Sequence, residues 1–217
     1  MPADSRRPSG PAVSSRTSSA GPERQRGTEQ RRREDTASRP APASGASQLN
    51  TDRAVVAEQL GREPRALRGI AARCPAGHPA VIQTNPRLAD GTPFPTLYYL
   101  TCPRLTALVS RLEASGLMRE MTERLATEPE LAAAYLAAHR AYLAERDAIE
   151  PLGTDVSAGG MPGRVKCLHV HVAHALAAGR GVNPFGDRAL DLLRDEWPAG
   201  SCAGDQSADE SRTKGQL

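Results

Sequence analysis

Hydrophobic side chains are spread unevenly along the chain, and their spacing separates a folded middle part from two polar ends. Residues 1–50 contain few large apolar side chains and are rich in Ser, Ala, Pro, Gly and Arg, which is typical of a segment that stays solvated. After this segment, apolar residues recur at regular intervals. The pattern predicts a disordered arm over 1–50, a single domain over 51–202 and a disordered tail over 203–217.

Three short segments of the middle part have the composition of β-strands. Residues 67–73 and 79–84 are apolar runs with β-branched side chains, and residues 96–101, Thr-Leu-Tyr-Tyr-Leu-Thr, have the strongest strand character. Asp90-Gly91 lies between the last two and predicts a turn. We therefore expect a small antiparallel sheet of about three strands, which becomes stable when helices cover it.

Helical periodicity begins on both sides of these strands. Residues 55–60 suggest a short helix, and the apolar residues of 105–112 recur at a spacing that places them on one helical face. Gly116 is expected to stop that helix, because glycine readily adopts the left-handed conformation at a helix end. A second helix is expected to start at Leu117.

The C-terminal part of the domain is expected to be helical as well. Thr127 and Glu130 have the spacing of a capping box, which predicts a long helix that ends near residue 149. A further helix is expected over 162–178, and Asp187 is expected to cap a last helix. The pattern as a whole predicts an α+β domain in which five or six helices cover the sheet.

Charge is concentrated in the N-terminal arm. The whole chain has a net charge of +3, while residues 1–50 contain nine Arg against five acidic residues. A basic arm of this kind can contact a polyanion weakly through counterion release. The rest of the chain has no basic stripe with interleaved aromatic residues, so we expect no specific binding of nucleic acid.

Composition also bears on the cellular compartment. No apolar stretch reaches the roughly 18–20 residues of a membrane span, and the N-terminus lacks the apolar core of a secretory signal. We therefore expect a cytoplasmic protein whose four cysteines are thiols rather than disulfides.

These thiols, together with nearby histidines, form a candidate metal site. Cys74, Cys102 and Cys167, with either Cys202 or His174 as the fourth ligand, could hold zinc or an iron–sulfur cluster. Helical geometry would place Cys167 and His174 on one face, with His171 near them and His169 nearly opposite. The alternative is that the cysteines are ordinary core side chains.

A second candidate site is the glycine-rich run before the helix expected over 162–178. Gly159, Gly160, Arg164 and Lys166 could bind a phosphate or carboxylate at the start of that helix. The alternative is a flexible connection with two solvated basic residues. If this site adjoins Cys167, the thiol could act as a nucleophile with His169 or His171 as its base.

Several runs of the sequence resemble one protein family, the domain of unknown function 501. They are Asp90–Pro103, Gly116–Met118, Ser157–Pro162, Arg164–His169, Ala173-His174, Gly181–Pro184 and Cys74-Pro75. The resemblance covers about residues 53–202. The chain departs from the family pattern at Ala76, where family members often have a second cysteine. This difference weakens the case for any site that needs a Cys-x-Cys pair.

The resemblance implies a bacterial protein, mainly of high-GC Gram-positive species. Genes of this family commonly lie between those of a septum-formation protein and an exopolyphosphatase-like phosphatase, which suggests a link to cell division or polyphosphate metabolism. No catalytic residues are established for the family, so whether the protein is an enzyme stays open.

Two hypotheses follow from these observations. The first is a regulatory cytoplasmic protein stabilised by a metal at the cysteines. The second is an enzyme that acts on a phosphorylated or anionic substrate at the glycine-rich turn. An interaction module that uses the basic arm is a third possibility.

Overall fold

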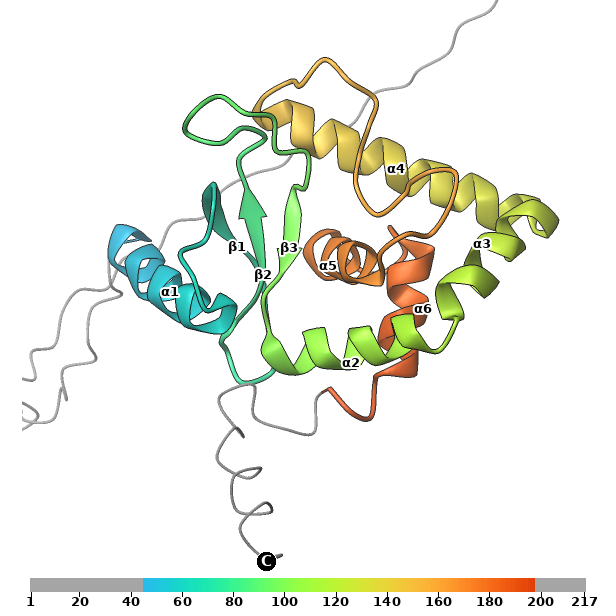
Figure 1. Cartoon of the computed structure of the whole chain (residues 1–217), viewed down its shortest axis with the longest axis horizontal. Helices are drawn as coiled ribbons and strands as arrows, with labels where there is room; N and C mark the ends of the chain where they lie inside the picture. Colours follow the sequence, from blue (N-terminus) through green and yellow to red (C-terminus); the bar gives the residue numbers. More distant parts are fainter. Residues whose placement is uncertain (1–44, 198–217) are drawn as a thin grey trace, which may run out of the picture. The chain divides into compact units, whose positions relative to one another are not determined.

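The computed structural model describes residues 45–197, and the helices and strands of this part surround a small sheet (Figure 1). In chain order the elements are α1 (Gly45–Leu60), β1 (Leu67–Arg73), β2 (Pro79–Thr84), β3 (Tyr98–Leu100), α2 (Pro103–Ala114), α3 (Leu117–Thr127), α4 (Pro129–Ile149), α5 (Leu168–Ala178) and α6 (Pro184–Leu192). The predicted α+β class, with a three-stranded antiparallel sheet and helices around it, is confirmed for the described residues.

Strand β2 is the centre of the sheet and pairs antiparallel with β1 on one side and β3 on the other. Its side chains are almost all buried, as expected for a strand covered on both faces. Strands β1 and β2 have the bounds that the sequence predicted. Strand β3 is shorter than the predicted 96–101, because the backbone N–H of Leu97 donates to the hydroxyl of Tyr142 on α4 at 2.6 Å.

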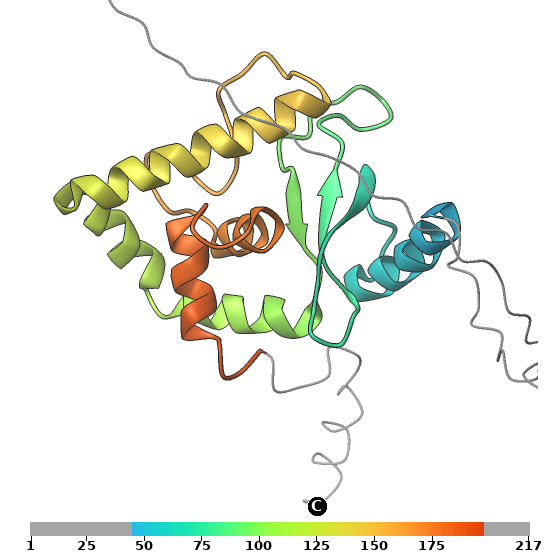
Figure 2. The ribbon, with the colours of Figure 1, turned by 180° about the vertical axis from the view of Figure 1, so that it is seen from behind.

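Helix α5 lies at the centre of the helical part, beside β3 and between α2, α4 and α6 (Figures 1 and 2). Its residues Leu168, His171, Val172, Ala173 and His174 have no exposed surface, and a helix that is apolar on most sides is expected to be buried. Helix α1 contacts β1 and β2, and the two views show it on the side of the sheet away from α5.

The start of α4 differs from the prediction. Thr127 is the last residue of α3, and Glu128 stands at the N-cap position of α4 without a side-chain cap bond. The Glu128 carboxylate is held instead by Arg124, at 2.6 Å. The capping box predicted from Thr127 and Glu130 is therefore wrong. Pro129 begins α4 in its place, because its fixed φ suits the first turn of a helix.

Helices α5 and α6 also begin at other residues than predicted. Helix α5 starts at Leu168 rather than near residue 162, because the backbone N–H of Lys166 donates to the carbonyl of Gly159, seven residues earlier, and Cys167 has extended backbone angles. Helix α6 is capped by Asn183, whose side chain accepts from the backbone N–H of Gly186 at 3.0 Å. Asp187, the predicted cap, lies in the first turn of α6.

The two ends of the chain, residues 1–44 and 198–217, lie outside the described residues. This includes most of the arm predicted to be disordered, the predicted tail and the candidate ligand Cys202. Residues 45–50, which the sequence analysis assigned to the arm, belong to α1. Among the described helices none is both long and apolar enough to cross a bilayer.

Candidate functional site

Three side chains with ligand or nucleophile chemistry meet where α2 packs against the start of α5. Cys167 stands at the N-cap position of α5, His169 lies in its first turn, and Glu113 lies near the end of α2. The Cys167 Sγ lies 3.9 Å from His169 Nδ1, and a carboxylate oxygen of Glu113 lies 3.1 Å from the same nitrogen. All three residues are partly exposed.

The orientation of the His169 ring is fixed from its other nitrogen. Nε2 lies 3.2 Å from the backbone carbonyl of Thr106 and 3.3 Å from the hydroxyl of Ser110. A carbonyl oxygen only accepts hydrogen bonds, so Nε2 carries a proton. The second ring nitrogen, Nδ1, is therefore the one turned toward Cys167 and Glu113. Hydrogen bonding to Cys167, followed by the charge of Glu113, raises the pKa of His169 to about 9.

Glu113 has a second contact that ties the site to the fold. Its carboxylate accepts from the backbone N–H of Leu168, the first residue of α5, at 2.6 Å. Acidic groups stabilise helix N-termini because the first N–H groups have no partner within the helix. The side chain of Cys167 makes no cap bond, so Glu113 supplies from another helix the cap that α5 lacks locally.

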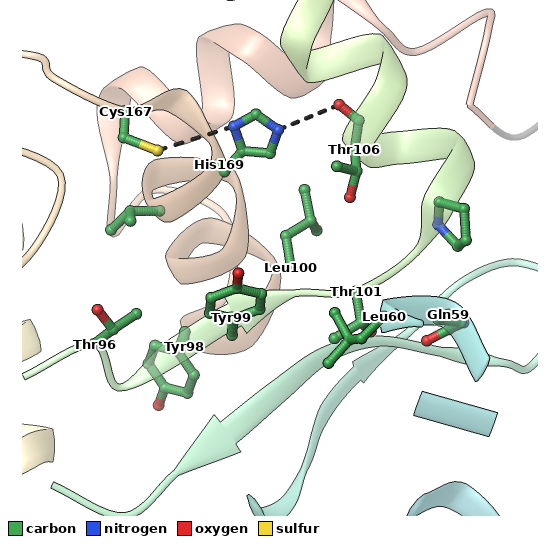
Figure 3. A pocket seen from close by; sticks show the side chains of 12 residues that line it. Gln59, Leu60, Thr96, Tyr98, Tyr99, Leu100, Thr101, Thr106, Cys167 and His169 are labelled. Atoms are coloured by element: carbon green, nitrogen blue, oxygen red, sulfur yellow. Dashed lines mark hydrogen bonds between the residues drawn. The ribbon is translucent and has the colours of Figure 1, made fainter. Parts of the chain in front are cut away.

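A cavity of about 490 Å³ opens beside Cys167 and His169 (Figure 3). It lies between the end of α1, strand β3 and the beginnings of α2 and α5. The lining residues are Gln59, Leu60, Thr96, Tyr98, Tyr99, Leu100, Thr101, Pro103, Thr106, Cys167, His169 and Val170. Figure 3 shows Cys167 and His169 on one wall and the residues of β3 on the facing wall. The volume is in the range of sites that bind small molecules.

A family model described as "Protein of unknown function (DUF501)" matches residues 70–191, which is more than half of the chain. The chain belongs to this family. The resemblance inferred from the sequence runs is thereby confirmed. The matched range of the DUF501 chain includes Glu113, Cys167 and His169. Neither a curated protein nor a solved structure shows significant similarity to the chain.

The structure does not bring the four sequence-predicted metal ligands that it describes, Cys74, Cys102, Cys167 and His174, into one group. Cys74 lies in the β1–β2 turn, with its Sγ 3.9 Å from His78 Nδ1, and Cys102 is fully buried before α2. Within the described part of the chain, one group of at least three candidate ligands has atoms within 4.8 Å of one another, and it is Glu113, Cys167 and His169. A set that includes Cys202 stays a prediction.

His174 and His171 form a separate, fully buried pair in the DUF501 chain. The amide nitrogen of Asn183 lies 3.3 Å from His171 Nδ1 and 3.2 Å from His174 Nδ1. An amide NH₂ has two hydrogens, so it donates one to each ring. Burial lowers the pKa of both histidines to about 4. Both therefore stay neutral at physiological pH.

The predicted helical face that joined Cys167 to His174 and His171 is wrong. Cys167 has extended backbone angles, φ −152° and ψ 111°, because α5 begins one residue later. Helical spacing therefore does not apply to it. The histidine that contacts Cys167 is His169, which the helical projection had placed on the opposite side.

The predicted anion site has a different shape from the one expected. Gly159 and Gly160 lie in turns before α5, and the backbone N–H groups of Arg164 and Lys166 donate to the carbonyls of Gly160 and Gly159, at 3.1 and 2.7 Å. These two N–H groups are therefore used within the loop, which packs against His171. The side chains of Arg164 and Lys166 are exposed, and anion binding by them stays a prediction.

Glu113 is the member of the site that the sequence analysis missed. It lies at the end of a polar stripe on α2, formed with Thr106 and Ser110 at spacings of four and three residues. Positions with this spacing share one helical face. This stripe is a signal in the sequence by which Glu113 could have been found. A polar face beside the apolar positions of a buried helix indicates that polar groups of another segment pack against it.

Proposed function

We propose that this DUF501 chain binds a divalent metal ion through Cys167, His169 and Glu113. The observation that carries the proposal is the position of His169 Nδ1, 3.1 Å from a carboxylate oxygen and 3.9 Å from a thiol sulfur. Because the ionised carboxylate only accepts hydrogen bonds, Nδ1 must face it with either a proton or a metal ion. The bond from Nε2 to Thr106 orients the ring as outer hydrogen bonds do for metal-bound histidines.

Zinc suits this donor set best. Zn²⁺ binds thiolate, imidazole and carboxylate together at about 2.0–2.3 Å, so tetrahedral ligand atoms are separated by about 3.3–3.8 Å. The three ligand atoms already lie within 4.8 Å of one another, which leaves only small side-chain movements for binding. An iron–sulfur cluster needs several cysteine thiolates, and this site offers one.

Three protein ligands leave one position of a tetrahedral zinc ion open, as in catalytic rather than structural zinc sites. Cys167 and His169 both line the cavity, so a small molecule within it has access to that position. Zinc in such a site polarises a carbonyl group or makes bound water a nucleophile near neutral pH. The proposed function is therefore a zinc-dependent activity in the cavity.

Zinc content of the purified full chain tests the proposal. We expect about one zinc per chain, lost in Cys167→Ser and His169→Ala. Glu113→Gln keeps an oxygen for the Leu168 N–H but removes the charge, so it should retain the fold and bind zinc at least about 10-fold more weakly, since loss of even an outer partner of a metal ligand has that effect. Elemental analysis and competition with a chelator give both quantities.

Cys74→Ala is the matched control, since it removes a buried thiol outside the cluster. It should leave zinc binding unchanged. Loss of zinc in Cys74→Ala together with full retention in Glu113→Gln would contradict the proposal and favour the ligand set predicted from the sequence.

A cysteine nucleophile is the second candidate function. It is favoured by the partly exposed Cys167, which lines the cavity next to the imidazole of His169. A nucleophile with an adjacent base is the usual arrangement of covalent catalysis. Metal-free full chain whose Cys167 alkylates stoichiometrically with iodoacetamide, and which takes up no added zinc, would favour this function. Protection of Cys167 by zinc would favour the metal site.

A further inference from the structure

The lining of the cavity beside the proposed metal site has no unbalanced charge. Among the described residues that line it, none is Lys, Arg, Asp or Glu. His169, whose pKa is raised to about 9, has its positive charge balanced by the Glu113 carboxylate 3.1 Å away. A bound zinc ion with one thiolate and one carboxylate would also have no net charge. Transfer of a charged ligand from water into such a site is costly unless an opposite charge meets it. The charge balance therefore favours an uncharged ligand.

Two buried polar atoms in the wall of this cavity have no hydrogen-bond partner. They are Oγ1 of Thr101, a residue that is 2% exposed, and Oε1 of Gln59. Both residues line the cavity, and Figure 3 shows them at its α1 end. Buried polar atoms without partners are rare in folded proteins and cost free energy. Their occurrence together in one cavity indicates groups that a ligand satisfies.

The chemistry of these two atoms specifies what the ligand offers. The Gln59 side chain donates through Nε2 to the carbonyl of Pro79 at 2.9 Å, which fixes the amide and leaves Oε1 as an acceptor. The Thr101 hydroxyl can donate. The complementary ligand group therefore has an N–H donor and a carbonyl acceptor. A neutral amide has both.

The rest of the lining suits an apolar substituent. Leu60, Leu100, Pro103 and Val170 contribute aliphatic surface, and the Tyr99 side chain is 38% exposed. An aromatic ring that is open to a cavity offers a large flat contact for an aromatic or aliphatic group. The orphan atoms are buried, so side chains around the cavity move when a ligand reaches them, as is common on binding.

We infer that this cavity binds an uncharged ligand with an amide group and an apolar substituent. This inference names the class of ligand that the proposed zinc site would act on. Any reaction of that ligand rests on the proposed function, whereas its binding depends on protein side chains alone. The uncharged ligand of this cavity differs from the anionic substrate that the sequence analysis expected at the glycine-rich turn.

The test compares 2-phenylacetamide with phenylacetate, which share a shape and differ in charge. Binding to the full chain is measured by NMR titration, once with zinc removed by a chelator and once with zinc added. We expect 2-phenylacetamide to bind the metal-free protein at least about tenfold more tightly than phenylacetate. Its contacts should map to Tyr99 and Val170.

Thr101→Val tests the orphan hydroxyl directly. The change keeps the side-chain shape and removes an atom without a partner, so the fold should be retained, which a thermal melt checks. We expect 2-phenylacetamide to bind this variant about five- to tenfold more weakly, the effect of one lost hydrogen bond. Thr127→Val, at an exposed position on α3, is the matched control and should bind normally.

Each failure has a different signature. Equal or tighter binding of phenylacetate to metal-free protein, or unchanged amide binding by Thr101→Val, overturns the ligand inference. Phenylacetate binding that appears only with zinc supports the metal site and also overturns the ligand inference. Amide binding in a protein that takes up no zinc supports the ligand inference and contradicts the proposed function.

Discussion

Three histidines within six residues of α5 have two opposite acid–base characters. The neighbours of His169, Cys167 and Glu113, raise its pKa to about 9, whereas burial lowers the pKa of His171 and His174 to about 4. The residue type is the same in each case, so the difference comes from what each ring faces. At the residue scale, His169 is the histidine of this helix that faces both a thiol and a carboxylate.

The buried pair predicts a pH dependence of stability. A folded pKa near 4 lies below the unfolded value near 6.5, so the unfolded chain binds more protons between these two pH values. The free energy of unfolding of metal-free protein should therefore fall as the pH is lowered from about 6.5 to about 4.5. The slope is up to about 1.4 kcal/mol per pH unit for each histidine.

Urea denaturation at a series of pH values measures this slope. His174→Gln removes one ring of the pair and should reduce the slope by up to about 1.4 kcal/mol per pH unit, whatever its effect on the absolute stability. The groups packed around His174, the rings of Tyr98 and Tyr142 and the amide of Asn183, do not ionise in this pH range. A slope that is the same in both proteins would contradict the assignment.

At the scale of elements, the close contact of α5 with α6 depends on a glycine. A Cβ at Gly186 would overlap the backbone carbonyl of His171 and approach the Cβ of Ala175 to 2.7 Å. Two helices can approach this closely only where one of them lacks a side chain. Gly186 therefore sets the separation of α5 and α6, and with it the position of Asn183 against the buried histidines.

Gly186→Ala should accordingly lower the free energy of unfolding by about 3 kcal/mol or more, since backbone atoms cannot give way as a flexible side chain can. Chemical denaturation gives the value. Arg188→Ala, at an exposed position of the same helix, is the control and should change stability by less than about 0.5 kcal/mol. If Gly186→Ala were as stable as that control, α5 and α6 could move apart without loss of stability, and the prediction would be wrong.

Sequence patterns predicted elements whose causes are local and missed those whose causes are distant. β1 and β2 have the predicted bounds, because their apolar runs are closed by nearby turn residues. The start of α5 was misplaced, because its cap comes from Glu113, 55 residues earlier. The site shows the same division. Cys167 and His169 were recognised as candidates, but their partner on α2 depends on how two helices pack.

At the scale of the whole molecule, basic charge and folded core belong to different parts of the sequence. The buried apolar residues of the described part lie between Val56 and Leu193. Residues 1–41 account for +4, while the full chain is +3, so residues 42–217 have a net charge of −1. Polyanion binding through the arm should therefore be separable from folding.

A chain that begins at Pro42 should keep its melting temperature to within about 2 °C, because it retains α1 and the core. It should lose retention on heparin, which the full chain is expected to show at low salt and to lose as salt screens the arginines. Persistent heparin binding by the shortened chain would place the basic contact on the domain instead.

One carboxylate serves both the fold and the proposed chemistry. Glu113 accepts from the amide of Leu168 and also faces His169, so any ion or molecule that draws this side chain outward weakens the first turn of the central helix. The amide proton of Leu168 should then exchange faster with solvent when the site is occupied. Its exchange rate therefore reports binding at this site without knowledge of the natural ligand.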